Sequence, residues 1–258
     1  MVRSLLTLLS LFVLGCSSFA QTLTIAAAAD LQFALQDVAQ RFEQSSGSKV
    51  KLIFGSSGNF ATQIENGAPF DLFFSADVGY PKKLDADGLI VPGSIYHYAS
   101  GKIVLWTRKD SKLDINRGLD LLLDPSVKKI AIADASHAPY GKAAVEALKH
   151  AGLYDKVSSK FVVGENISQT ANFAASGAAD VGIIALSLAL APQLSEKGSY
   201  WLIPEEDYSP IEQATAILKS SHQQELAGRF LKFMQSPEIA DLMHRYGFSL
   251  PAAPAPRQ

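Results

Sequence analysis

The sequence predicts an α/β protein with mostly parallel sheets, because short apolar runs typical of strands alternate with segments whose apolar residues recur at helical spacing. Glycine, proline, asparagine or aspartate residues follow these runs and mark the turns between them. With 258 residues, of which 48 % are apolar and 19 % charged, the chain has enough core for two domains of modest size.

The first 20 residues have the pattern of a signal peptide and contribute nothing to the predicted fold. Arg3 is the short positive region, and residues 5–14 form an apolar region too short to span a bilayer as a mature helix. Ser18 and Ala20 are small residues at the positions that a signal peptidase reads, so we predict cleavage before Gln21.

A second reading of the same segment stays open. Residues 13–16 (VLGC) resemble a lipobox, in which Cys16 would be acylated and would anchor the protein to a membrane. Leu14 is bulky for its lipobox position, which favours simple cleavage. Cys16 is the only cysteine, so a chain starting at Gln21 has neither disulfides nor cysteine metal sites.

The first region after the leader is expected to alternate strands and helices. Asp30 is a favoured N-cap residue and follows the first strand directly, so it should begin the first helix. The expected strands are residues 22–28, 50–54 and 71–75, and the expected helices are residues 31–45, 59–65 and 81–87.

A crossing between domains is expected at residues 99–102, and a return crossing at 204–210. Between them we expect strands at residues 101–107, 129–133, 161–163 and 180–185, with helices at 118–123, 140–151, 167–176 and 186–194. After the return we expect a strand at 211–218, helices at 223–234 and 237–245, and a frayed tail at 251–258.

The ends of five strands carry turn or helix-start residues: Asp30 and residues 55–58, 76–77, 139–140 and 166–167. In open α/β sheets such ends gather at one crevice. Glycines at residues 55–58 let backbone amides converge, and amides at a helix start favour an anion. Residues 54–77 contain no lysine or arginine, so the sequence predicts a pocket that holds an anion with neutral groups.

The charge balance excludes some functions. The formal net charge is −2 without a basic run, which gives nucleic acid no electrostatic footprint. Removing residues 1–20 removes Arg3 and no acidic residue, so the remaining chain is more negative than the full one. An anion must therefore be bound by local dipoles and not by net charge. The five histidines lack metal-ligand spacing, so no metal site is expected.

Four motifs carry a resemblance to a known family. They are residues 26–31 (AAAADL), 55–57 (GSS), 67–77 (GAPFDLFFSAD) and 245–248 (RYGF). With them the chain resembles the molybdate-binding periplasmic proteins of ABC importers from about Thr22 to Phe248. The resemblance implies a type II periplasmic binding protein fold, with two α/β lobes joined by two crossover segments. Lobe 1 would be residues 21–99 and 205–250, and lobe 2 residues 100–204.

The resemblance also implies a function. The chain would be an extracytoplasmic substrate-binding protein, not an enzyme, that captures a tetrahedral oxyanion, molybdate or tungstate, and delivers it to an ABC importer permease in the inner membrane. It would be a periplasmic monomer without a cofactor or direct metal ligands. Carried over by motif, the anion contacts are Asp30, Ser57, Ala76, Tyr140 and Ile167. Ser57 would offer hydroxyl and amide, Ala76 and Ile167 their amides, and Tyr140 an amide and a hydroxyl.

Two residues depart from the family pattern. The family often has serine or threonine where Asp30 stands, and a tyrosine hydroxyl where Ala185 stands. A carboxylate beside a dianion is repulsive, which leaves two arrangements. The Asp30 side chain either caps its own helix, which we expect, or accepts a hydrogen bond from a protonated oxyanion such as phosphate or a phosphonate.

Two other classes remain as alternatives. Ser57, His137 and an aspartate could form the triad of a serine hydrolase, but the sequence lacks the G-x-S-x-G turn. Asp30, Asp71 and Asp77 could bind a hard cation, although carboxylates at strand ends more often cap helices.

Overall fold

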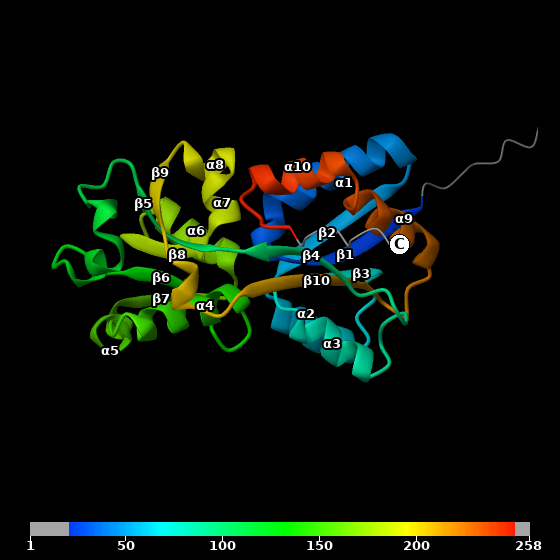
Figure 1. Cartoon of the computed structure of the whole chain (residues 1–258), viewed down its shortest axis with the longest axis horizontal. Coiled ribbons are helices and arrows are strands. Elements are labelled where there is room, and N and C mark those ends of the chain that lie inside the picture. Colours follow the sequence, from blue (N-terminus) through cyan, green and yellow to red (C-terminus); the bar gives the residue numbers. More distant parts are fainter. Residues whose placement is uncertain (1–20, 251–258) are drawn as a thin grey trace, which may run out of the picture.

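The structure, a computed structural model that describes residues 21–250, consists of two α/β lobes lying side by side (Figure 1). The sheet of lobe 1 has the order β2-β1-β3-β10-β4. Its strands are β1 (Thr22–Ala28), β2 (Lys49–Gly55), β3 (Leu72–Ser75), β4 (Tyr96–Gly101) and β10 (Ile211–Ile217). Its helices are η1 (Ala29–Leu31), α1 (Gln32–Ser46), α2 (Ser57–Glu65), α3 (Gly79–Ala86), α9 (Gln224–Met234) and α10 (Pro237–Arg245).

Both faces of the lobe 1 sheet are covered, and β1 shows why. Side chains alternate across a strand, so Leu23 and Ile25 enter the cluster beneath α1, α9 and α10, whereas Ala26 enters the cluster beneath α2 and α3. A strand that is apolar on both faces belongs in the centre of a sheet. β1 accordingly pairs in parallel with both β2 and β3.

The sheet of lobe 2 has the order β7-β6-β8-β5-β9. Its strands are β5 (Ile103–Arg108), β6 (Ile130–Ala133), β7 (Phe161–Gly164), β8 (Val181–Ala185) and β9 (Gly198–Leu202). Its helices are α4 (Pro139–His150), α5 (Tyr154–Val157), α6 (Ile167–Ser176), α7 (Leu186–Leu190) and α8 (Pro192–Ser195). Short 3-10 segments are η2 (Ile115–Leu123), η3 (Ser158–Lys160) and η4 (Glu205–Asp207). Trp106 of β5 is fully buried in the core of this lobe.

The chain passes between the sheets twice, once between Gly101 and Ile103 and once between Leu202 and Ile211. The two passages lie together, because Ile211 pairs with Gly101 where β10 and β4 meet. Figure 1 shows β4 and β10 running side by side toward lobe 2.

The expectation of mostly parallel sheets is wrong. In each sheet two strand pairs are parallel and two are antiparallel. The antiparallel pairs all involve the strands that lead into or out of a crossing, β4, β5, β9 and β10. These strands are not joined to their neighbours by a helical crossover, so nothing forces them to run parallel.

Two of the expected helices also differ from the observed ones. Residues 118–123 belong to a longer 3-10 segment that bends at Gly118, where φ is +58°. The apolar segment 186–194 is divided into α7 and α8. Ala191 is extended between them (φ −62°, ψ 141°), because the proline that follows disfavours helical geometry at the preceding residue. Among residues 21–250, no helix has the length and apolar character required to cross a bilayer.

Gly141, in the first turn of α4, sets how closely that helix approaches the sheet. A Cβ added there would lie 2.2 Å from the carbonyl oxygen of Ala133, the last residue of β6. Backbone cannot move aside as a flexible side chain can. Close packing at this point therefore places Pro139 and Tyr140 at the edge of the sheet that faces lobe 1.

We predict that Gly141→Ala lowers the free energy of unfolding by about 1–3 kcal/mol, because the added methyl group overpacks this contact. Gly228→Ala is the matched control, since a Cβ on Gly228 in α9 meets no atom within 4 Å. That change should be neutral or stabilising by up to about 1 kcal/mol. Denaturant unfolding of both variants tests the prediction, and equal midpoints would contradict it.

Candidate functional site

One small cavity, with a volume of about 10 Å³, lies between the two lobes. It contains all five residues expected to contact the anion. Its lining is Ala28, Ala29, Asp30, Gly55, Ser56, Ser57 and Ala76 from lobe 1, with Ala138, Pro139, Tyr140, Asn166 and Ile167 from lobe 2. No lysine or arginine is among these residues. The strand ends thus meet at one crevice as expected, except that Asp77 lines a neighbouring open groove instead.

Three helices begin at the cavity. α2 starts at Ser57, α4 at Pro139 and α6 at Ile167. The first amides of a helix have no partner within it and carry its positive dipole end. In α6 the side chain of Asn166 accepts from the amides of Ser168 and Gln169, at 3.1 and 3.0 Å, and not from that of Ile167. Convergent helix starts without a cation suit an anion.

Ser57 and Ala76 interact with each other. The amide of Ala76 donates to Ser57 Oγ at 2.9 Å, and Ser57 is fully buried. The amide of Ala76, which we expected to contact the anion, therefore donates to Ser57 in this structure. Because Oγ accepts that bond, its own proton is left to donate into the cavity.

Asp30 is buried, with 1 % of its surface exposed, and it bridges the lobes. Its Oδ2 accepts hydrogen bonds from Tyr140 Oη at 2.9 Å and from Gln213 Nε2 at 2.8 Å. Its Oδ1 is buried with no hydrogen-bond partner among the described residues. Its backbone carbonyl accepts from Ser187 Oγ of α7 at 2.8 Å.

The expectation that the Asp30 side chain caps its own helix is wrong. Asp30 lies inside the 3-10 turn η1, and no side chain caps the start of η1 or of α1. A cap residue must precede the helix, whereas Asp30 is already within the helical turn. Its carboxyl group turns instead toward Tyr140 of the other lobe.

Sequence reasoning missed Gln213 and Tyr98, which complete this polar network. Gln213 Nε2 also donates to Tyr140 Oη at 2.9 Å, and Gln213 Oε1 accepts from Tyr98 Oη at 2.7 Å. Gln213 is fully buried and lies where the pairing of β10 with β4 is irregular. A signal existed, because an amide side chain within an apolar strand needs buried partners.

Burial dominates the electrostatics of this network. It raises the pKa of the Asp30 carboxyl to about 7, although the hydrogen bonds from Gln213 and Tyr140 and the nearby amides of Asp30 and Leu31 favour the ionised form. Burial, followed by the nearby charge of Asp30, raises the pKa values of Tyr140 and Tyr98 well above their usual value. The two tyrosines therefore stay neutral, and Asp30 can gain or lose its proton near neutral pH.

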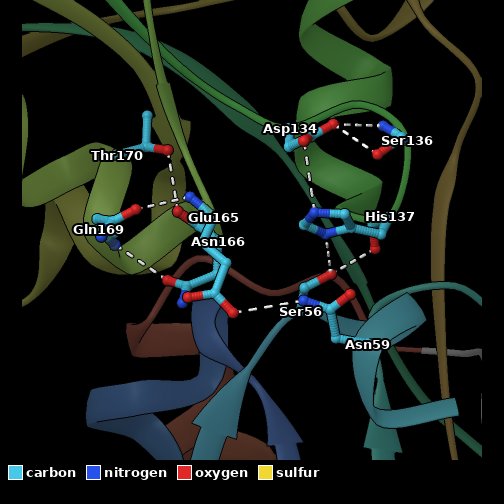
Figure 2. Close-up of polar contacts among 9 residues, drawn as sticks. All are labelled: Ser56, Asn59, Asp134, Ser136, His137, Glu165, Asn166, Gln169 and Thr170. Carbon is cyan, nitrogen blue, oxygen red and sulfur yellow. Dashed lines mark hydrogen bonds and ion pairs between the residues drawn. The ribbon is translucent and has the colours of Figure 1, made fainter. Parts of the chain in front are cut away.

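Polar contacts close the mouth of the cleft (Figure 2). The Ser56 hydroxyl donates to the carbonyl oxygen of His137 and lies 2.9 Å from His137 Nδ1. The amide of Gly58 donates to the same carbonyl at 3.0 Å. Asn59 donates to Glu165 at 3.3 Å. Each contact joins lobe 1 to lobe 2, so the structure is the closed form.

The geometry does not form the hydrolase triad that Ser57 and His137 suggested. Ser56, not Ser57, contacts His137, and its proton is directed at the His137 carbonyl oxygen. His137 Nε2 lies 3.5 Å from Asp134 Oδ2, which holds the ring at the cleft mouth. Within residues 21–250, no group of three or more His, Cys, Asp or Glu side chains is arranged to hold a metal ion.

The fold and the cavity define a class, the two-lobed proteins that close around a small solute. Residues 23–249 match the family model described as "Bacterial extracellular solute-binding protein". The chain belongs to this family, which confirms the expected periplasmic binding protein fold.

Relatives within the family carry more specific names. The chain is 39 % identical over 223 residues to "Molybdate-binding protein ModA" of Rhodobacter capsulatus, covering 86 % of each chain. It is 37 % identical over 238 residues to the protein of that name from Azotobacter vinelandii, covering 92 % of this chain and 94 % of the relative. The solved Azotobacter vinelandii periplasmic molybdate-binding protein superposes with a TM-score of 0.84 at 36 % identity, over 89 % of this chain and all of that one. The resemblance seen in the sequence motifs is confirmed.

The raised pKa of Asp30 predicts a pH-dependent stability difference between the wild type and Asp30→Asn. Between about pH 4 and 7 the folded protein keeps the Asp30 proton that the unfolded chain has lost. The stabilisation associated with the neutral carboxyl is therefore complete below the unfolded pKa and is lost as pH rises through the folded pKa of about 7. Asp30→Asn should gain stability over the wild type across this window, by up to about 1.4 kcal/mol per pH unit.

Denaturant unfolding at pH 4, 6 and 8 measures this difference, with Asp77→Asn as the control. Asp77 carries the same charge near the cavity but lies in the open groove, where it accepts from the amide of Gly79. Parallel pH profiles for the wild type and Asp30→Asn would show that Asp30 ionises normally in the folded protein.

Proposed function

We propose that this protein is the substrate-binding component of an ABC importer and that it captures molybdate or tungstate between its lobes. The observation that carries the proposal is the convergence of three helix starts, at Ser57, Pro139 and Ile167, on a closed cavity lined by no lysine or arginine. The names of the relatives from Rhodobacter capsulatus and Azotobacter vinelandii support the same ligand.

The proposed contacts follow from the geometry. Ser57, Tyr140 and Ile167 offer first-turn amides, and Ser57 adds its hydroxyl. Ala76 acts through Ser57, because its amide fixes the position of Oγ. Amides in a closed cavity stabilise a dianion through aligned dipoles, without the desolvation cost of burying a countercharge.

Capture and delivery would use closure of the lobes about the crossings between Gly101 and Ile103 and between Leu202 and Ile211. Residues 21–99 and 205–250 would move against residues 100–204. An anion bridging both lobes favours the closed form, and the permease would recognise that form. No catalysis and no cofactor form part of this proposal.

We also propose that the protein is exported and acts as a periplasmic monomer. The segment that decides between cleavage before Gln21 and acylation at Cys16 lies outside the described residues, as does the tail at 251–258. The solved Azotobacter vinelandii protein is named a periplasmic molybdate-binding protein, which supports this location.

Calorimetric titration with molybdate, tungstate, sulfate and phosphate tests the ligand. Molybdate and tungstate should bind at least tenfold more tightly than sulfate or phosphate, a difference of about 1.4 kcal/mol or more. Binding of phosphate alone would overturn the proposed ligand, and would indicate that Asp30 accepts a hydrogen bond from a protonated anion.

Ser57→Ala should weaken molybdate binding tenfold to a hundredfold, because it removes a charge-assisted hydrogen bond of about 1.5–3 kcal/mol. Ser199→Ala is the matched control, since Ser199 lies on the exposed surface of β9. Circular dichroism should show the same fold for both variants. An unchanged dissociation constant for Ser57→Ala would remove Ser57 from the site.

A further inference from the structure

We infer that binding of a doubly charged oxyanion is coupled to the uptake of one proton by Asp30, and that the Oδ1 hydroxyl of the neutral acid then donates a hydrogen bond to the anion. This inference rests on the proposed function, because it requires a dianion in the cavity that Asp30 lines. Neutral donors alone could hold an anion, and proton uptake gives the Asp30 carboxyl a role beside them.

The hydrogen bonds of Asp30 determine which oxygen carries the proton. Oδ2 accepts from Tyr140 and from Gln213, so it has the bonding pattern of a carbonyl oxygen. Oδ1 is buried without a partner among the described residues. A protonated carboxyl has one O–H donor and one accepting oxygen, so the proton belongs on Oδ1. A hydrogen-bond acceptor in the cavity would then satisfy Oδ1, the oxygen of the Asp30 carboxyl that has no partner among the described residues.

The groups around Asp30 are uncharged, and burial favours its neutral form although the hydrogen bonds from Gln213 and Tyr140 favour the ionised one. Tyr140 of α4 and Tyr98 of β4 are titratable but remain neutral, because burial raises both pKa values. Gln213 of β10 and Ser187 of α7 carry no charge. No lysine, arginine or histidine within residues 21–250 contributes to the shift of the Asp30 pKa.

A dianion makes the preference stronger. Two like charges repel more strongly in a closed cavity than in water, because the effective dielectric is lower. Burial, partly offset by the hydrogen bonds that the carboxyl accepts, raises the pKa of Asp30 to about 7, and a neighbouring dianion raises it further. At pH 8 an open protein with exposed Asp30 has an ionised carboxyl, so closure on the anion must take up a proton.

Titration calorimetry with molybdate tests this coupling. At pH 8, in two buffers of different ionisation enthalpy, the wild type should take up about one proton per anion bound. Between pH 7.5 and 8.5 its dissociation constant should rise about tenfold. Asp30→Asn should take up no proton and bind with the same affinity at both pH values, because its amide N–H donates without a titratable proton.

Asp77→Asn is the matched control, since it removes the same charge close to the site but outside the cavity. It should keep the proton uptake of the wild type. Asp30→Ser is a second variant that also lacks a titratable group, should Asp30→Asn fail to fold. A wild type that binds molybdate without proton uptake overturns the inference but leaves the proposed function intact. A wild type that ignores molybdate overturns both.

Discussion

The constraint on which this structure depends is that the amides proposed to bind the anion belong to different lobes. α2 starts in lobe 1, whereas α4 and α6 start in lobe 2. Each helix start alone is a weak anion site, because its field falls off within one turn. The three fields add only when the lobes are closed. The proposed anion site is therefore complete only in the closed conformation, so the affinity for the ligand would include the free energy of closure.

Closure is stabilised by contacts at two depths. At the mouth, partly exposed groups such as Asn59 and Glu165 meet across the cleft, and contacts of this kind contribute little each. At the base, the buried pair of Asp30 and Tyr140 joins the lobes away from water. Opening the lobes hydrates both groups, so this bond contributes to closure only the net difference between a protein hydrogen bond and hydrogen bonds to water.

Much of this arrangement could be predicted from the sequence, because it depends on local order along the chain. A strand followed directly by glycine, serine or a helix start marks its own carboxyl end, and parallel strands bring such ends together. The five turn regions at strand ends were found in this way, and residues from each of them line one cavity. The individual residues expected to contact the anion came from the family resemblance. The antiparallel orientation of the strands at the crossings could not be predicted in this way. Their pairing, such as that of Ile211 with Gly101, joins residues far apart in the chain.

Asp30 shows the same limit of prediction from local sequence. Its sequence neighbourhood favours a helix cap, and local preference is all that a sequence window contains. The observed partners lie 110 and 183 positions away, at Tyr140 and Gln213. Tertiary hydrogen bonds outcompeted the local one because a buried carboxyl needs more than one partner. A chain that places an acid beside an anion must either neutralise it or hold it away, and here the pKa shift favours neutralisation.

Gly101 connects this chemistry to the movement of the lobes. It is the last residue of β4 before the crossing, and a Cβ there would lie 2.0 Å from Tyr140 Oη and 2.7 Å from Gln213 Nε2. Tyr140 can reach Asp30 only because the crossing strand has no side chain at this position. The backbone of the crossing is thus in contact with the hydroxyl that binds Asp30. A side chain at Gly101 would therefore displace the Tyr140 hydroxyl from Asp30, so the hydrogen bond that joins the lobes at their base depends on a glycine in the crossing.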